Sequence, residues 1–376
     1  MEFRDLKEQY RQLKREMDAA LLEAAASGAY IMGKTVTELE ERLAAYVGVK
    51  HCVTCANGTD ALTLALKAWG IGKGDAVFVP DFTFFSSAEV VALEGATPVF
   101  VDVEADSFNI DCKSLETAIA AVKAEGRLKP RVVVAVDLFG RPADYETLMS
   151  VVNKHGLLLL EDGAQGFGGK IGEKRACCFG DIATTSFFPA KPLGCYGDGG
   201  AIFTDNEQWA TLLRSYRVHG KGENKYDNVR IGLNSRLDTL QAAVLQVKLK
   251  AFERYELEAV NTAAALYNEH LRNVEEIVLP NIPQPMVSSW AQYTLRLHDK
   301  IDRTVLQARM KQEGIPTMVY YPTPMSEQTA FKEVKRYVET PVAHTLSQSV
   351  LSLPMHPYLK ENDITFISQT LQRCLR

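Results

Sequence analysis

The chain has 376 residues, of which 46% are hydrophobic and 24% charged, and its formal net charge is −5. This length exceeds one compact core, so we expect a large domain over residues 1–250 and a smaller one over 251–376. The acidic balance argues against a general nucleic-acid binder or a protein of anionic membrane surfaces, although a few local cations would suffice for one phosphate. The charged start resembles no signal peptide and no apolar run is long enough to cross a bilayer, so we expect a cytoplasmic protein.

The first two thirds of the chain alternate between helical and β-type patterns. Apolar periodicity predicts helices over residues 5–26, Val36–Tyr46, Thr59–Trp69, Ser86–Leu93, Leu115–Ala124 and Tyr145–Lys154. The β-type runs are Cys52–Cys55, Ala76–Val79, Pro98–Val103, Val132–Val136, Leu157–Leu160, Ile182–Phe188 and Ala201–Thr204. Near-continuous Val, Ile and Leu strands that alternate with helices predict an α/β fold, with a mostly parallel sheet covered on both faces.

The remainder of the chain has a different character. A helical pattern with few breakers, Asp238 to Arg272, is expected to lead out of the large domain. After the proline-rich stretch Pro280–Pro285, Trp290–Leu297 alternates like a strand, while Asp302–Glu313 and Asp363–Leu375 have helical periodicity. These scattered elements predict a smaller α+β domain.

The seven cysteines are spread thinly, so a disulfide framework is not expected. Cys52 and Cys55 form a C-x-x-C pair, which is compatible with a redox or zinc site. No second such pair or histidine pair completes a zinc set, and Cys52 lies in an apolar, strand-like run. The pattern favours buried structural thiols and no metal site.

Lys191 is the first candidate for chemistry. Prolines flank it and four glycines follow it, which places it badly for a helix or a central strand. It comes just after the β-type run Ile182–Phe188, so its amine would project from the end of a strand, where α/β proteins keep their chemistry. A partly desolvated lysine can lose its proton and form a Schiff base with a carbonyl compound. The alternative is an ordinary surface-loop lysine.

A turn with glycine joins the first strand to its helix, with the sequence Asn57-Gly58-Thr59-Asp60. Gly58 permits a tight turn, the free N–H groups at the helix start favour a phosphate, and Thr59 adds a hydroxyl. An ordinary capped helix remains the alternative, because Asn, Thr and Asp all cap well.

Asp162 is the third candidate, because the apolar strand Leu157–Leu160 runs directly into it. A carboxylate buried at a strand end needs a fixed partner, such as a protonated ring nitrogen, whose pKa it would raise. Helix capping by Asp162 is the alternative. Ser186 on the next strand offers a further hydroxyl ahead of Lys191. A phosphate cradle, a buried carboxylate and a lysine on successive strand ends are what pyridoxal 5′-phosphate requires.

At this point the chain resembles the nucleotide-sugar aminotransferases of the DegT/StrS type, which share the aspartate-aminotransferase fold of type I pyridoxal phosphate enzymes. The resemblance runs nearly end to end, and the segment that holds Lys191 is its most specific part. The matching motifs are Gly28-Ala-Tyr-Ile-Met-Gly33, Cys55-Ala-Asn-Gly-Thr-Asp60, Glu161-Asp162, Ser186-Phe-Phe-Pro-Ala-Lys191, Gly197-Asp-Gly-Gly-Ala201, Asn234-Ser-Arg-Leu-Asp238 and Leu353-Pro-Met-His-Pro-Tyr358.

The resemblance implies roles for the residues around the cofactor ring. Lys191 would hold the cofactor and later move the proton between substrate and cofactor. Asp162 would pair with the ring nitrogen, and Gln165 would lie near the cofactor's oxygen. Phe84 would stack on the ring, unless it is a core aromatic like its neighbours Phe82 and Phe85.

The resemblance also implies how the cofactor phosphate is held. Gly58, Thr59 and Ser186 would bind it within one subunit. Asn234 would reach the phosphate of the neighbouring subunit, which makes a homodimer obligatory for the site.

The implied reaction is an amino transfer in two halves. L-glutamate would convert the cofactor to pyridoxamine 5′-phosphate, and a keto-sugar nucleotide would then take the amine. The motifs look most like a subgroup that aminates C3 of UDP-2-acetamido-2-deoxy-3-oxo-glucuronate for bacterial surface polysaccharide such as O-antigen. Arg236 is the candidate for the uronate carboxylate, with an intersubunit ion pair as its alternative.

Three further residues are candidates for the sugar. Tyr320 and Tyr321 lie in a loop thought to face the sugar, where many members of the family have His-Tyr-Pro. His219 is a possible substrate neighbour, with a structural role in its loop as the alternative.

The sequence also has to be compared with other possible functions. Within the same chemistry, the substrate could be a 4-keto- or 3-keto-6-deoxy sugar nucleotide. A sugar dehydratase of this fold lacks the lysine, and a non-catalytic regulator would lack Lys191 or Asp162, whereas both are present. A nicotinamide-dependent oxidoreductase would need G-x-G-x-x-G after the first strand, which is missing.

Overall fold

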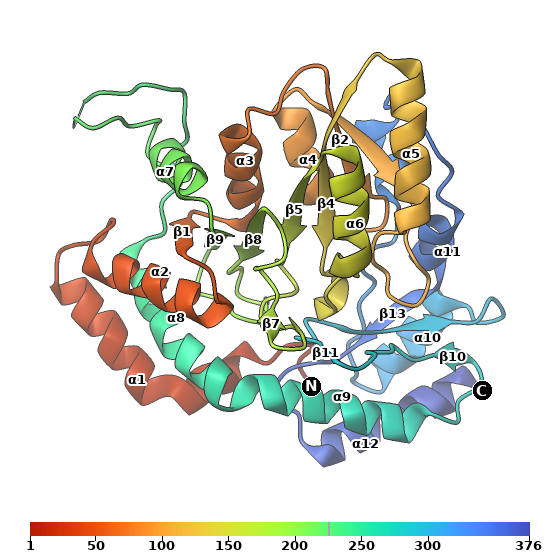
Figure 1. Ribbon diagram of the computed structural model, residues 1–376. Coiled ribbons are helices and arrows are strands. Elements are labelled where there is room, and N and C mark those ends of the chain that lie inside the picture. The colour runs from red at the N-terminus through yellow and green to blue at the C-terminus, as the bar shows by residue number, and fades with distance from the viewer. Residues whose placement is uncertain (225) are drawn as a thin grey trace.

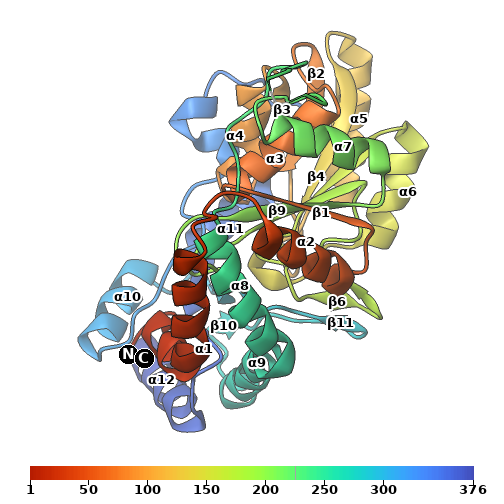
Figure 2. The same cartoon turned by 90° about the vertical axis from the view of Figure 1, so that its left-hand side faces the viewer.

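The computed structural model describes residues 1–224 and 226–376. A large sheet with helices on both faces forms one part, and a layer of long helices with a small sheet lies below it (Figure 1). Both chain ends lie in this lower layer, and Figure 2 shows α1 (Leu6–Ala26) running beside α8 (Thr239–Ala251).

The central sheet has seven strands in the order β1-β9-β8-β5-β4-β2-β3. Only β9 runs against its neighbours, because it pairs antiparallel with both β1 and β8 while the other pairs are parallel. The prediction of a mostly parallel sheet of an α/β fold is therefore confirmed. The strands are β1 (His51–Cys55), β2 (Asp75–Pro80), β3 (Thr97–Val101), β4 (Lys129–Val136), β5 (Leu158–Asp162), β8 (Ile182–Ser186) and β9 (Gly200–Thr204).

The apolar strands are buried on both faces because their side chains alternate. On β4, Val132, Val134 and Val136 pack into one core cluster, whereas Val133 and Ala135 pack into another on the opposite face. The first face is covered by α3 (Gly58–Ala68), α4 (Ser86–Leu93) and α7 (Glu207–Tyr216), and the second by α2 (Lys34–Val47), α5 (Cys112–Glu125), α6 (Tyr145–His155) and α8.

The long helix expected between residues 238 and 272 is interrupted. A π-helical turn, Phe252–Glu256, joins α8 to α9 (Leu257–Leu271). This turn directs both Phe252 and Glu256 into the interior. The carboxylate of Glu256 is thereby buried where the chain leaves the large sheet. A buried carboxylate requires hydrogen-bond donors or a cation beside it.

The last third of the chain builds a second core around a three-stranded sheet in the order β10-β12-β13. The predicted helices at residues 302–313 and 363–375 are present, whereas α7, α11 and β13 were not anticipated. The elements are β10 (Ile277–Val278), β12 (Tyr293–Leu297), α10 (Arg303–Gln312), α11 (Pro341–Ser349), β13 (Val350–Leu353) and α12 (Glu361–Leu375). A small sheet joins β6 (Lys170–Ile171), β7 (Lys174–Arg175) and β11 (Met286–Val287), and 3-10 turns lie at Leu138–Gly140, Met325–Glu327 and Thr329–Phe331.

A domain boundary near residue 250 stays a prediction. Ala343 and Leu346 on α11 pack into the same core cluster as α3 and α4. The backbone N–H groups of Val342 and Ala343 donate to the carboxylate of Asp102, which follows β3. Part of the second segment therefore packs against the large sheet.

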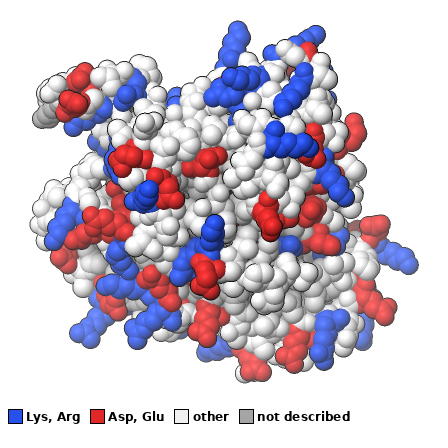
Figure 3. Space-filling view, in the orientation of Figure 1, with Lys and Arg blue, Asp and Glu red and all other residues white. Residues whose placement is uncertain are grey.

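The described surface shows how charge is distributed, and the described interior shows the state of the cysteines. Acidic and basic side chains are mixed over the face seen in Figure 3. Among the described residues, no helix combines the length and the apolar character needed to cross a membrane. All seven cysteines are free, and Cys52 and Cys55 are buried, as predicted. Burial raises the pKa of both thiols, so they are inert.

Candidate active site

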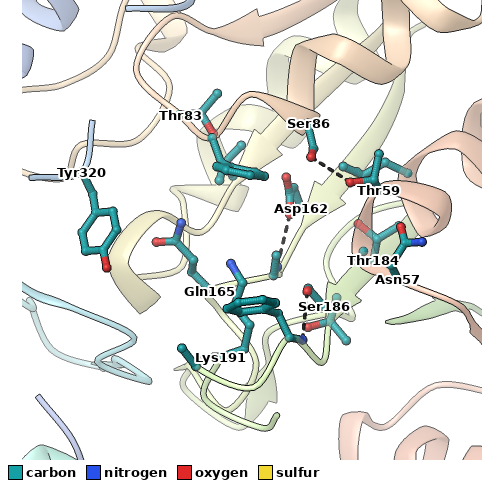
Figure 4. A pocket seen from close by; sticks show the side chains of 18 of the residues that line it. Asn57, Thr59, Thr83, Ser86, Asp162, Gln165, Thr184, Ser186, Lys191 and Tyr320 are labelled. Atoms are coloured by element: carbon teal, nitrogen blue, oxygen red, sulfur yellow. Dashed lines mark hydrogen bonds between the residues drawn. The ribbon is translucent and has the colours of Figure 1, made fainter. Parts of the chain in front are cut away.

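The carboxyl ends of β1, β5 and β8 open into one cavity of about 480 Å³. Figure 4 shows Asp162 in its centre, between the hydroxyls of Thr59 and Ser86 and the side chain of Lys191. Nine of the residues named from the sequence line this cavity: Gly58, Thr59, Phe84, Asp162, Gln165, Ser186, Lys191, Tyr320 and Tyr321.

The turn after β1 brings the start of α3 against β8. Asn57 caps α3, since its side-chain oxygen accepts from the N–H of Asp60 at 2.8 Å. A Cβ on Gly58 would lie 2.7 Å from Cβ of Ser186, closer than packed carbon atoms tolerate. The glycine therefore permits this approach of helix to strand, and the capped helix proposed as the alternative is present as well.

Polar groups of the kind that hold an anion gather at the start of α3. The first N–H groups of a helix have no partner within it, and they carry the positive end of the helix dipole. The hydroxyls of Thr59 and Ser86 lie 2.8 Å apart, and Ser186 Oγ accepts from the N–H of Phe188 at 3.3 Å. Helix N–H groups and three hydroxyls together suit a phosphate.

Asp162 ends β5 and is 5% exposed. Its carboxylate accepts from Ser87 Oγ at 2.8 Å and from the N–H of Ala164 at 3.2 Å. Burial raises the pKa of Asp162, while these two donors and the charge of Lys191 oppose the shift. A cationic partner in the cavity would therefore stabilise the ionised form.

Ser87 was not anticipated from the sequence. It lies in the first turn of α4, where a serine reads as an ordinary helix-start residue. Only the packing of α4 against β5 makes its hydroxyl a donor to Asp162.

Lys191 lies five residues beyond the end of β8, in a turn closed by its own N–H, which donates to the carbonyl of Phe188 at 2.8 Å. Burial lowers the pKa of its amine, the carboxylate of Asp162 opposes this shift, and the charge of Arg4 adds to it. A lysine with a lowered pKa beside a carboxylate and an anion site is suited to bind a carbonyl group and to move protons.

The aromatic and amide residues form one wall. Phe84 is 52% exposed while Phe82 is buried, so the alternative that Phe84 is a core aromatic is wrong. Its ring centroid lies 6.0 Å from that of Tyr321. Gln165 donates to Tyr321 Oη at 3.0 Å and accepts from the N–H of Phe139 at 2.7 Å, which fixes its amide.

Asn234 and Arg236 line a second recess of about 510 Å³ rather than the main cavity. Asn57 and Asp198 line both, so the two openings are neighbours. His219 lines neither of these cavities, is exposed, and its N–H donates to the carbonyl of Leu233 at 2.8 Å. The structure therefore separates these three residues from the cavity of their own chain.

Pyridoxal 5′-phosphate fits the donor set of the cavity. The start of α3 with its hydroxyls suits the phosphate, Asp162 suits a protonated ring nitrogen, and the amine of Lys191 suits the aldehyde. The site needs no metal for this chemistry, and the described residues include no group of three or more side chains that could hold one.

Comparison with known proteins agrees with this geometry. The family model of the DegT/DnrJ/EryC1/StrS aminotransferase family matches residues 11–372. The chain is 43% identical to a UDP-2-acetamido-2-deoxy-3-oxo-D-glucuronate aminotransferase of Pseudomonas aeruginosa, over 99% of each chain. It is 40% identical to a pleiotropic regulatory protein of Geobacillus stearothermophilus, over 99% of this chain and 98% of the other.

Solved structures show the same fold. A DegT/DnrJ/EryC1/StrS aminotransferase from Brucella abortus superposes with a TM-score of 0.96 at 48% identity, covering 100% of this chain and 99% of the other. A putative sugar aminotransferase of Streptococcus pneumoniae, solved in its PMP form, shares the fold at 23% identity with a TM-score of 0.88 over 96% of both chains. This chain is an aminotransferase that uses pyridoxal 5′-phosphate, with the fold of type I enzymes, and it belongs to the DegT/DnrJ/EryC1/StrS aminotransferase family.

Proposed function

We propose that this enzyme transfers the amino group of L-glutamate to C3 of UDP-2-acetamido-2-deoxy-3-oxo-D-glucuronate, in the cytoplasm, for bacterial surface polysaccharide such as O-antigen. The similarity to the Pseudomonas aeruginosa aminotransferase over the whole chain supports this substrate. The observation that carries the proposal is the single cavity that combines Lys191, Asp162 and the start of α3. A regulatory role without catalysis would not require this combination.

In the proposed reaction, separate groups of the chain bind the cofactor, keep its ring protonated and move the proton. When bound, pyridoxal 5′-phosphate supplies the electron sink. The buried carboxylate of Asp162 keeps the ring nitrogen protonated, and the start of α3 with Thr59 and Ser186 anchors the phosphate. The amine of Lys191, whose pKa burial lowers, would carry the proton that moves between the substrate carbon and the cofactor.

Phe84 and Gln165 complete the proposed cofactor site. Phe84 offers an exposed ring face to the cavity, and Gln165 offers an amide fixed by two hydrogen bonds. Tyr320 and Tyr321 line the same cavity and are proposed to face the sugar. No role in substrate binding is proposed for His219, since it lines neither the cavity nor the recess that holds Asn234 and Arg236.

We further propose that the working unit is a homodimer in which Asn234 and Arg236 serve the partner's site. Both residues line a recess next to, but outside, the cavity of their own chain. Ile31, at the rim of that recess, and nearby Tyr30 are exposed apolar side chains, as is Phe188 beside the cavity. Apolar surface around a shared polar recess suits an interface between copies.

The substrate is tested with a panel of UDP- and dTDP-keto sugars, with L-glutamate as the donor and mass spectrometry of the products. We expect amination of the 3-keto-uronate. Amination of a 4-keto-6-deoxy sugar without activity on the 3-keto-uronate would contradict the choice of substrate.

The variant Arg236→Met tests the choice of the uronate substrate through one residue. Loss of a charged hydrogen bond to the uronate carboxylate should lower kcat/KM for the uronate roughly 10- to 100-fold, and leave a 3-keto sugar without the carboxylate nearly unaffected. Arg272→Met, at an exposed arginine that follows α9, is the matched control. Equal losses on both sugars would favour the ion-pair alternative.

Subunit complementation tests the dimer. When Lys191→Ala and Asn234→Ala subunits, each impaired alone, are mixed in equal amounts, about a quarter of the wild-type activity should return. About half of the dimers are then mixed, and one of the two sites in each mixed dimer has both native residues. No recovery after verified exchange of subunits would place Asn234 outside the partner's site.

A further inference from the structure

The chain start lies against the loop that holds Lys191. Arg4 precedes α1, and its guanidinium donates to the carbonyl of Lys191 at 2.8 Å and to that of Pro192 at 3.4 Å. Among the described hydrogen bonds, neither carbonyl has another donor. The residue that presents the amine to the cavity is thus held from behind by a side chain 187 residues away in sequence.

A buried carboxylate balances Arg4. Glu256, in the π-helical turn between α8 and α9, is 3% exposed and accepts from Gln9 Nε2 at 2.9 Å and from the hydroxyl of Tyr358. Burial lowers the pKa of Arg4 to about 10, and the attraction of Glu256 is the largest opposing effect. Arg4 therefore stays charged at neutral pH, within a polar cluster behind the Lys191 loop.

The segment around Arg4 is fixed on its other side as well. The ring of Phe3 lies 6.2 Å from that of Tyr320, which lines the cavity. The carbonyl of Phe3 accepts from the N–H of Met355 at 3.2 Å, just beyond β13. The backbone that presents Arg4 is thus held by two separate segments of the last third of the chain, one at Tyr320 and one at Met355.

The charges around Lys191 come from several elements. Asp162 on β5 faces its amine from the cavity side and favours protonation, whereas Arg4 disfavours it from behind. Lys248 on α8 adds a second buried cation behind the loop, near Arg4 and Glu256, and lies 4.6 Å from the ring centroid of Tyr196. Asp162 and Arg4 are the charged groups that shift the pKa of Lys191, whereas Lys248 interacts with Glu256 and Arg4 behind them.

We propose that Arg4 is a positioning residue for Lys191: its two hydrogen bonds to the carbonyls of Lys191 and Pro192 fix the loop that presents the amine. The charge of Arg4 also lowers the pKa of that amine. The inference rests on the role proposed for Lys191, but not on the identity of the sugar. It predicts two separable effects of Arg4, one on the mobility of the loop and one on the protonation of the amine.

The test uses the full chain without cofactor, so that neither donor nor sugar is required. Arg4→Met removes both hydrogen bonds, which come from Nη2, and the charge, whereas Arg4→Lys keeps the charge but replaces the planar guanidinium that makes them. Arg15→Met, at an exposed arginine of α1, is the matched control. The two measurements are hydrogen exchange of the peptide over residues 187–195 and the pH midpoint of Lys191 labelling by an amine reagent, read by mass spectrometry.

We expect Arg4→Met to raise exchange in that peptide about tenfold or more and to move the labelling midpoint of Lys191 to higher pH. Arg4→Lys should keep the midpoint near wild type while exchange rises. With cofactor and L-glutamate, Arg4→Met should lower kcat roughly 10- to 100-fold with KM nearly unchanged.

Identical exchange and midpoint in Arg4→Met and Arg15→Met would overturn the proposal, and so would a midpoint in Arg4→Lys shifted as far as in Arg4→Met. If Arg4→Met does not fold, Arg4→Gln replaces it in the test, because Gln keeps a hydrogen-bond donor without the charge. The labelling midpoint of Lys191 should then shift to higher pH. An unchanged midpoint in Arg4→Gln would refute the effect of charge. Failure of the sugar panel alone would leave both measurements intact.

Discussion

Replacing Asp162 with Asn removes one charge at the centre of the cavity and keeps the shape of the side chain. Asn retains an oxygen that can accept from Ser87 or from the N–H of Ala164. The native carboxylate is 5% exposed and burial raises its pKa, so its ionised form has a cost in the empty cavity. That cost is offset when a cationic ring nitrogen binds.

The magnitude follows from the burial of this pair. Removing one partner of a buried ion pair costs about 3 to 5 kcal/mol, which corresponds to a cofactor affinity lowered between roughly 100-fold and several thousand-fold. The effect on the cofactor-free protein has the opposite sign. Because the folded-state pKa of Asp162 is raised, the wild type loses stability as pH rises from the unfolded-state pKa through the folded one, and the Asp162→Asn variant avoids this loss.

The assay is a cofactor titration at pH 8 followed by absorbance, with thermal melts of each protein with and without cofactor. Asp162→Asn should bind weakly, yet melt without cofactor at or above the wild-type temperature. Asp111→Asn is the control, because Asp111 caps α5 and Asn caps equally well. An affinity within about threefold of wild type, or a cofactor-free protein less stable by more than about 1 kcal/mol, would refute the reasoning.

Two further substitutions probe the surroundings of this site. Gly58→Ala would place a Cβ 2.7 Å from that of Ser186, so it should lower stability by about 1 to 3 kcal/mol and weaken cofactor binding. Gly72→Ala is the control, because the atom nearest to its Cβ would lie at 3.5 Å. The same melts and titrations should show no loss of stability or of cofactor binding for Gly72→Ala. Asp137→Asn removes one member of the buried carboxylate pair that Asp137 forms with Glu161. Burial raises the pKa of Asp137 well above its usual range and raises that of Glu161 to about 7. The wild type should therefore lose stability as pH rises from about 5 to 8, and the variant should lose roughly 1 to 3 kcal/mol less, as measured by urea unfolding at both pH values; equal losses would contradict the coupling.

The parts of the fold that apolar patterning specifies were predictable. Strands such as β4 and β5 are nearly continuous runs of Val or Leu, and the sheet follows from their alternation with helices. The opposite direction of β9 was not predictable, because a strand's direction depends on the long connection that precedes it rather than on its own residues. The helix α7 was missed although its sequence carries the signals of a helix, with Asn206 as its cap and Ala210 and Leu213 on its buried face.

Some residues of the cavity were also predictable from the sequence, whereas others were not. Gly58, Asp162 and Lys191 each lie at or just beyond the end of a strand, and the ends of parallel strands meet at one edge, so their proximity was predictable from chain order. The contacts of Ser87 and Arg4 were not, because they depend on how α4 and the chain start pack in three dimensions. Neither residue type, in its local sequence, differs from an ordinary helix-start residue.

Locating the lysine that holds the cofactor tests most directly whether Lys191 has this role. The cofactor-loaded protein is reduced with borohydride, digested, and its peptides analysed by mass spectrometry. We expect one reduced cofactor adduct, on Lys191, and none in Lys191→Ala. Lys248 is the internal control, since it is also a buried lysine whose pKa burial lowers, to about 8, yet it lies outside the cavity. An adduct on Lys248 or elsewhere, with Lys191 unmodified, would contradict the central claim.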